Sequence, residues 1–449
     1  MKIQSTKNLI FAVSSSFLRA VLRIIQIIIT ARIFTPSEMG QVAFAWYLLG
    51  LLPLLTDPGL STLVIRTKKN LNNEIFVLAL IQSILAIFIT ITALQISFLH
   101  LNSVQKNACL LVLGIVIGNG FSIVWRSNIE KEGKFFQLAV LDFFSALIGV
   151  TTTIICALNE FGVISIFLGG FASNCINNLF LIFLKKNSIR INFNLNKTNL
   201  YECLIFERNF FLKNILRQLF FSLDLLMAIC FFNQHDLGIY ILPRNLIFEF
   251  FLTVAIPLQR VTLSSVAKTV SSKVEIQKVF EWAYFISFSF TIIIILFSSD
   301  IVNILFGSDY KESATILEFL AFIPLARLTL VIFESFRDIN SSQKTGIFLS
   351  FSNSFSLIML LLIYKDGLKN FIFIILLHSI LSFVFLVTYF FARYKIDLYQ
   401  RIIPATFLNI ITIFIHFSLP VNLSLFIQVF AHLLALILGS FYIYRNVNR

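Results

Sequence analysis

The sequence predicts an all-α membrane protein of about fourteen transmembrane helices, with two six-helix lobes around a central cavity and two additional C-terminal helices. Three observations predict this class. The 449 residues are 58% hydrophobic and 13% charged, with a mean hydropathy of +0.90. Apolar runs reach roughly 20 residues, the length that crosses a hydrocarbon core as a helix. Basic residues concentrate in alternate breaks between those runs.

Cutting the chain at its polar breaks places the spans in order. The first apolar run carries Arg19 and Arg23 and has no small-residue cleavage site, so we expect it to remain as the first helix rather than a signal peptide. The predicted spans lie near residues 9–33, 40–65, 75–99, 107–127, 136–158, 161–184, 209–232, 237–262, 281–306, 313–335, 345–364, 369–392, 400–417 and 421–444.

The net charge of +13 is explained by membrane orientation rather than by nucleic-acid binding. One set of loops, with both termini, carries roughly 22 basic residues, whereas the other set carries about five. The positive-inside rule then places both termini in the cytoplasm and makes the number of spans even. We therefore expect a multi-pass membrane protein with membrane lipids as partners and no nucleic acid.

The longest polar connection divides the chain into comparable parts. We predict an N-terminal six-helix lobe at 1–184, a cytoplasmic linker at 185–208, a C-terminal six-helix lobe at 209–392 and two additional helices at 393–449. The second lobe begins as the first does. Residues Ser37–Gly40 are echoed by His235–Gly238 about 198 positions later, and Pro58 is echoed by Pro257. A duplicated six-helix unit is common in secondary transporters.

Polar residues inside the apolar spans carry the functional signal. A central arginine costs roughly 2.5–3.5 kcal/mol to insert, so such a residue faces a cavity or a partner. In the first span Arg19, Arg23 and Gln26 share one helix face. The other candidates are Asp57, Asp142, Arg217, Asp224, Arg244, Glu249, Arg260, Arg327 and Glu334.

Two interpretations of these charges remain open. They can be structural, because charges pair to hold helices together and those near span ends extend to the interface. Alternatively, they can face a ligand. Arg19, Arg23 and Arg217 lie deeper, and for them we favour a ligand-facing role. Asp57 and Asp142 are isolated acids in the sequence, and each requires a cation, a proton or a basic partner.

Nothing in the chain indicates catalysis, a cofactor or a metal site. The longest loop is too short for a soluble catalytic domain, and no metalloprotease, phosphate-loop or nucleophile-elbow motif is present. The five cysteines and five histidines are scattered without ligand spacing. We expect a secondary-type transporter or flippase rather than an enzyme.

The stretch ARIFTPSEMGQVAFAWYLLGLLPLLTDPGLSTLVIR, Ala31 to Arg66, resembles the opening of polysaccharide exporters of the Wzx/WzxC type. Those exporters belong to a superfamily that also holds the multidrug MATE and lipid II flippase families. Later segments resemble the same family in the same order: LAVLDFFSALIGVTTTIICAL from Leu138, GIYILPRNLI from Gly238 and ILFGSDYKESATILEFLA from Ile304.

The resemblance implies a flippase that moves undecaprenyl-diphosphate-linked oligosaccharide repeat units of O-antigen, lipopolysaccharide, capsule or exopolysaccharide by alternating access. Arg19, Arg23, Arg217 and Arg327 would bind the diphosphate, because guanidinium groups suit paired phosphate oxygens. The remaining polar candidates would line the cavity or bind a coupling H⁺ or Na⁺. A polysaccharide polymerase and a chain-length regulator are the expected protein partners.

Three alternatives stay open at this point. A MATE-like cation-coupled drug antiporter would need a cavity dominated by acids, whereas the candidates here are at least as basic as acidic. A lipid II flippase shares the fold and the substrate class. A membrane-embedded polymerase would be expected to have a substantial outer loop with polar catalytic residues, and the outer loops here are short.

Overall fold

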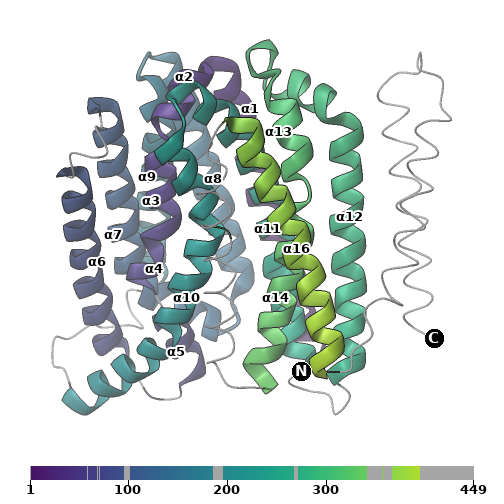
Figure 1. The fold of residues 1–449 in the computed structure, drawn as a ribbon. Helices are drawn as coiled ribbons and strands as arrows, with labels where there is room; N and C mark the ends of the chain where they lie inside the picture. Colours follow the sequence, from purple (N-terminus) through teal and green to yellow (C-terminus); the bar gives the residue numbers. More distant parts are fainter. Residues whose placement is uncertain are drawn as a thin grey trace. The chain divides into compact units, whose positions relative to one another are not determined.

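The computed structural model describes residues 2–57, 59–67, 69, 71–95, 102–185, 196–266, 272–340, 357 and 367–394. Every regular element in these ranges is helical, and nine helices are long and apolar enough to span a membrane, which confirms the predicted class (Figure 1). The predicted spans at 345–364, 400–417 and 421–444 lie outside the described residues, residue 357 apart. The total of about fourteen therefore stays a prediction.

The chain forms two compact units. The first contains residues 1–241 and 347–355, and the second contains residues 242–346 and 356–449. The linker predicted at 185–208 and the two lobes on either side of it remain predictions. Residues from Lys197 onward are part of a helix, because α10 runs from Lys197 to Phe231.

The first unit is built on long helices that follow the predicted apolar runs. These are α1 (Lys2–Ile33), α6 (Asn72–Gln95), α7 (Ser103–Lys131), α8 (Phe135–Leu158) and α9 (Ser165–Lys185), with the short helix η2 (Gly162–Ile164) before α9. Helix α8 packs against α1 and α9, and α7 packs between α6 and α9. Their mutual packing creates the frame in which the polar residues of α1, α7, α8 and α9 can meet.

The span predicted at 40–65 is confirmed in part: residues Pro36–Thr56 form one of the nine candidate spans, but the segment is not one continuous helix. The structure has four short helices there: α2 (Pro36–Gln41), α3 (Ala43–Leu51), α4 (Pro53–Thr56) and α5 (Leu60–Arg66). Pro53 has no backbone N–H to donate, and Asp57 leaves the helical region at φ −140° and ψ 71°. The helical backbone is therefore interrupted at Asp57, an acidic residue inside the bundle.

The start of α10 is fastened to the first unit by polar contacts. Lys69 Nζ lies 2.7 Å from Glu202 Oε2. The buried carboxylate of Glu74 accepts hydrogen bonds from the backbone N–H of Asn196 at 3.4 Å and from Asn199 Nδ2 at 3.3 Å. Further along, α10 packs against α3, so it also forms a wall of this unit.

The predicted sequence echo has a structural counterpart at the starts of α2 and α11 (Gln234–Val266). Thr35 caps α2 through Glu38, and Asn233 caps α11 through Asp236, 198 positions later. A Cβ atom built on Gly40 would overlap the carbonyl oxygen of Gln234. One built on Gly238 would overlap the carbonyl oxygen of Pro36. The two helix starts thus make reciprocal backbone contacts that only glycine permits.

The second unit contains the rest of α11 from residue 242, followed by α12 (Ser272–Leu305), the short η3 (Ser308–Tyr310), α13 (Ser313–Leu320), α14 (Ile323–Asn340) and α16 (Leu368–Tyr394). Helix α14 packs between α12 and α16. Helix α12 bends at Phe297. The following residue, Ser298, donates a hydrogen bond from Oγ to Glu318 Oε1 of α13 at 2.5 Å. The buried hydroxyl of Thr291 donates to the carbonyl oxygen of Ala321 at 2.7 Å.

Candidate functional site

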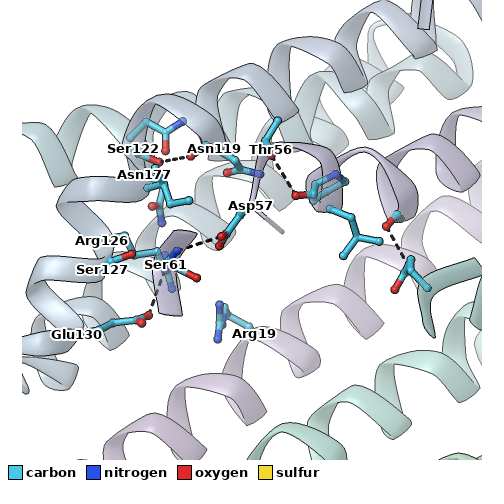
Figure 2. A pocket seen from close by; sticks show the side chains of 16 residues that line it. Arg19, Thr56, Asp57, Ser61, Asn119, Ser122, Arg126, Ser127, Glu130 and Asn177 are labelled. Atoms are coloured by element: carbon cyan, nitrogen blue, oxygen red, sulfur yellow. Dashed lines mark hydrogen bonds and ion pairs between the residues drawn. The ribbon is translucent and has the colours of Figure 1, made fainter. Parts of the chain in front are cut away.

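The first unit holds a half-open cavity of about 550 Å³, within the range of small-molecule sites, and most of the residues that line it are polar or charged. Helices α1, α3, α4, α5, α7, α9 and α10 contribute to its wall (Figure 2). The described lining residues are Arg19, Gly50, Pro53, Leu54, Thr56, Asp57, Ser61, Asn119, Ser122, Ile123, Arg126, Ser127, Glu130, Asn177, Asn178 and Gln218.

Asp142, a buried residue of α8, organises the charges of this site. Arg126 of α7 donates to both of its oxygens, Nη1 to Oδ1 at 3.0 Å and Nη2 to Oδ2 at 2.8 Å. Arg19 Nη1 of α1 lies 3.2 Å from Oδ2, and Asn177 Nδ2 of α9 donates to Oδ1 at 3.0 Å. Asp142 is isolated in the sequence, where it required a cation, a proton or a basic partner. In the structure it contacts side chains of three other helices, two of them arginines.

Arg126 and Arg19 differ in how they contact Asp142. Arg126 makes the bidentate contact that suits a guanidinium and a carboxylate, and it also lies 3.6 Å from Glu130 Oε1. The side chain of Arg19 is 38% exposed and faces the cavity (Figure 2). Because the exposures of Arg19 and Arg126, 38% and 33%, are close, the two differ mainly in that Arg126 contacts both oxygens of Asp142 and Arg19 contacts one.

Asp57 reaches the cavity because the second span is broken at this point. One of its oxygens, Oδ1, accepts a hydrogen bond from the backbone N–H of Ser61 at 3.1 Å. In Figure 2 the side chains of Asp57 and Arg19 face the same opening. The sequence-predicted residues Arg19, Asp57 and Asp142 are thus brought to one site, with Asp142 directly behind the wall.

An amide network forms the α7 and α9 side of the cavity. Asn178 Nδ2 donates to Asn174 Oδ1 at 2.8 Å, and Asn174 Nδ2 donates to Asn119 Oδ1 at 2.7 Å. Asn177 Nδ2 also donates to Ser145 Oγ of α8 at 3.0 Å. Asn174 and Asn177 thus bond to neighbouring helices, whereas the bond of Asn178 lies within α9. Asn177 and Asn178 in addition line the cavity.

The described charges around the cavity nearly cancel. Two guanidinium groups, Arg19 and Arg126, and two carboxylates, Asp57 and Glu130, line it. Asp142 contacts both arginines and brings the formal sum of the five groups to −1. The site is therefore polar and compensated in charge rather than simply cationic.

Three other candidates of the first unit lie outside the lining set that the structure describes. Gln26 Nε2 donates to Thr153 Oγ1 of α8 at 3.0 Å, which joins α1 to α8. Arg23 is exposed on α1. The buried carboxylate of Asp224 accepts a hydrogen bond from the Tyr240 hydroxyl at 2.8 Å. The predicted stripe on α1 therefore divides, and Arg19 is its member at the cavity.

In the second unit, two predicted arginines meet at one aromatic ring. The guanidinium carbons of Arg244 and Arg327 lie 5.2 and 5.0 Å from the centroid of Phe248, and both arginines are buried. Glu249 follows Phe248 on α11 and is half-buried. The side chains of Arg217, Arg260 and Glu334, on α10, α11 and α14, fall outside the described part of the structure.

Arg126, Glu130 and Asn119 line the cavity but were not among the site residues predicted from the sequence. Arg126 lies at the end of the span predicted at 107–127, where a basic residue usually marks a loop, but its side chain lies at the cavity. One signal was available: Asp142 needed a basic partner, and both residues lie within two helical turns of the connection between α7 and α8. No cluster of three metal-ligating side chains occurs among the residues that the structure describes.

The fold and this cavity define the class: a multi-pass α-helical membrane protein with a cavity lined by charged and amide side chains. Residues 29–315 match the family described as polysaccharide biosynthesis protein. Because the match covers more than half of the chain, the protein belongs to this family, and the resemblance seen from Ala31 onward is confirmed.

A relative from Klebsiella pneumoniae is described as an uncharacterized membrane protein in the cps region. It is 25% identical over 163 residues, which are 35% of this chain and 33% of the relative. The chain therefore matches about a third of that relative's length.

Solved structures show the same fold at low sequence identity. The lipid II flippase MurJ in an inward closed conformation has a TM-score of 0.71 at 15% identity, covering 98% of this chain and 100% of MurJ. A MOP-superfamily transporter from Pyrococcus furiosus, whose description reports reverse polarity of the binding pocket, has a TM-score of 0.58 at 17% identity over 88% and 95% of the two chains. An outward-facing multidrug MATE transporter has a TM-score of 0.58 at 16% identity over 87% and 96%.

Proposed function

We propose that this protein is a flippase that moves undecaprenyl-diphosphate-linked oligosaccharide repeat units across the bacterial inner membrane by alternating access. Membership in a polysaccharide biosynthesis family supports a role in polymer export. The fold shared with flippases and transporters supports translocation rather than catalysis. The match to a membrane protein from a cps region supports a surface polysaccharide as the end product.

One observation carries the proposal: Arg19 lines a polar cavity inside a membrane bundle while it contacts a carboxylate. A phosphate oxygen offers a guanidinium the same kind of charge-assisted hydrogen bond as a carboxylate oxygen. A diphosphate can therefore replace Asp142 at Arg19, because Asp142 keeps the bidentate contact with Arg126. The exchange leaves no buried carboxylate without a cation.

The remaining assignments extend this proposal. Arg23, Arg217 and Arg327 supply further cations to the diphosphate as the cavity changes its access, and the lipid tail stays in the bilayer. Asp57, Asp224 or Glu249 binds the H⁺ or Na⁺ whose gradient resets a secondary-type cycle. Both termini lie in the cytoplasm, and the polymerase and chain-length regulator receive the translocated units.

The test compares surface polysaccharide in a strain lacking the gene with strains complemented by wild type, Arg19→Gln or Arg32→Gln at matched membrane expression. Arg32 is the control, because it lies on the same helix and is exposed outside the described lining of the cavity. We expect wild type and Arg32→Gln to restore the polymer. Arg19→Gln is expected to leave it low and to accumulate lipid-linked units on the cytoplasmic side.

Two results would contradict the proposal. Full restoration by Arg19→Gln would remove Arg19 from substrate binding. Normal polymer in the deletion strain, together with increased sensitivity to cationic drugs, would replace the flippase with a MATE-like antiporter. The carboxylates of Asp57 and Glu130 would then be the groups that face the drug.

A further inference from the structure

We infer that the wall formed by Asp57, Asn119, Asn177, Asn178 and Gln218 is a glycan subsite that binds sugar hydroxyls next to the diphosphate. This inference rests on the proposed function and assigns a second part of the same cavity. Its ligand class is a polyhydroxylated sugar, and these five side chains determine which sugar is accepted. Arg19 lines the same cavity.

The first argument is the direction of the hydrogen bonds that the wall still offers. Within the described structure, no bond is made by Oδ1 of Asn177, Oδ1 of Asn178 or the second oxygen of Asp57. Gln218 uses its Nε2, which donates to the Gly50 carbonyl at 3.0 Å, and its Oε1 makes no bond in the same described part. Four acceptors are thus available at the cavity, with Asn119 Nδ2 as an available amide donor.

An acceptor-rich wall distinguishes a sugar from a phosphate. Each sugar hydroxyl carries one donor and two acceptor positions, so it can satisfy both the carbonyl oxygens and the Asn119 amide. An ionised phosphate group has only acceptor oxygens. It would face the oxygens of Asp57, Asn177 and Asn178 with no proton to share, which is unfavourable at short distance. The wall is therefore complementary to the glycan and repels the diphosphate.

The second argument is the charge balance. Arg126 is committed to Asp142 and close to Glu130, so its positive charge is compensated inside the protein. Asp57 adds a carboxylate to the wall itself. A neutral sugar gains from this arrangement, because a carboxylate and an amide side by side can bind neighbouring hydroxyls without a net charge on the ligand.

The third argument is rigidity. The amides of Asn119, Asn174 and Asn178 are bonded in series, and Asn177 is fixed by Asp142 and Ser145. A Cβ atom on Gly118 would overlap the amide oxygen of Asn174, so this glycine lets the amides pack closely against α7. Side chains held in this way present their oxygens in fixed directions, which a stereospecific sugar site requires.

The experiment measures binding of three probes to the purified full-length protein in nanodiscs. The probes are the free repeat-unit oligosaccharide released from the host polymer, farnesyl diphosphate, and the organic cation tetraphenylphosphonium. The variants are Asp57→Asn, which keeps the side-chain shape but turns an acceptor into a donor, Asn178→Ala and Arg19→Gln. Asn159→Ala is the control, because Asn159 is exposed and bonds only to the Ile155 carbonyl of its own helix.

Wild type and Asn159→Ala are expected to bind the oligosaccharide. Asp57→Asn and Asn178→Ala are each expected to weaken this binding by about tenfold, as loss of a good hydrogen bond does, with farnesyl diphosphate changed less than about twofold. Arg19→Gln is expected to weaken farnesyl diphosphate binding by about tenfold and to change oligosaccharide binding by less than about twofold. Equal melting temperatures of the isosteric Asp57→Asn variant and wild type exclude a folding defect as the cause.

The contrary results separate two failures. If farnesyl diphosphate binds but the oligosaccharide does not, or if Asp57→Asn and Asn178→Ala weaken only diphosphate binding, the glycan subsite is wrong and the flippase proposal survives. If neither the oligosaccharide nor farnesyl diphosphate binds and tetraphenylphosphonium binds through Asp57, both are wrong, and the cavity is a cation site.

Discussion

The contacts of Asp142 make a quantitative prediction about stability. Asp142→Asn keeps the shape of the side chain but removes the charge that compensates Arg126 and Arg19. Two guanidinium groups would then lie in a membrane bundle without their common carboxylate. We expect the free energy of unfolding to fall by about 2–3 kcal/mol, intermediate between the costs for buried and exposed pairs.

The magnitude follows from the exposure of the three side chains. Asp142 is 6% exposed, whereas Arg126 and Arg19 are 33% and 38% exposed. Breaking a fully buried pair costs about 3–5 kcal/mol, and an exposed pair contributes about 0–1 kcal/mol. Solvent reaching the arginines moves the cost below the buried limit. The buried carboxylate and its bidentate partner keep it above the exposed one.

A double-mutant cycle of Asp142→Asn and Arg126→Gln measures this pair. Reversible unfolding in mixed detergent micelles, followed by tryptophan fluorescence, gives the free energy for wild type, both single variants and the double variant. We expect a coupling energy of about 1–2 kcal/mol, typical of residues in one network. Arg19→Gln should cost less than about 1 kcal/mol, since Arg126 still neutralises Asp142. Additive single effects would refute the assignment of Asp142 and Arg126 as one buried pair.

Two further predictions concern packing. Gly40→Ala should destabilise the protein by about 1–3 kcal/mol, because the new Cβ would overlap the Gln234 backbone. In the control Gly170→Ala, the new Cβ meets only the end of a flexible side chain at 3.3 Å, so stability should hardly change. Equal melting temperatures of the two variants would contradict the reciprocal contact. Gln26→Ala should lower the free energy of unfolding by about 0.6 kcal/mol through loss of the hydrogen bond to Thr153, with polysaccharide export preserved. Loss of export at normal stability would show instead that Gln26 takes part in ligand binding.

The fold was predictable wherever hydrophobicity alone determines structure. Apolar runs located nine helices that the structure confirms as candidate spans, because a segment in lipid must satisfy its own backbone hydrogen bonds. The second span is one of these nine, but the same criterion did not predict the breaks within it. Hydropathy does not distinguish one long helix from α2–α5, because the apolar content is the same in both. The break at Asp57 depends on backbone geometry, and there the Asp57 carboxylate accepts a hydrogen bond from the Ser61 backbone N–H.

The site was predictable only in part, because a sequence shows which charges are costly but not which ones meet. Arg19 and Asp57 were selected for their depth, and both line the cavity. Gln26 has the same spacing as Arg19 but reaches Thr153 instead. Arg126 was hidden by its position near a span end, where a basic residue usually marks the cytoplasmic side. Only packing of α7 against α8 and α9 brings it to Asp142.

An arginine that already contacts a carboxylate is better suited to a flippase than an uncompensated one. A free guanidinium in a membrane cavity would bind any phospholipid headgroup or inorganic anion, and a cavity this polar is open to both. With Asp142 in place, an anion must compete with a carboxylate that is 3.2 Å away. A diphosphate alone then gains less free energy than it would at an arginine without a carboxylate partner. Under the proposed function, the glycan contacts add to this free energy, so the complete lipid-linked unit is expected to bind more tightly than either part alone. After translocation, Asp142 can return to Arg19 and help to release the product, because both ligands compete for one guanidinium.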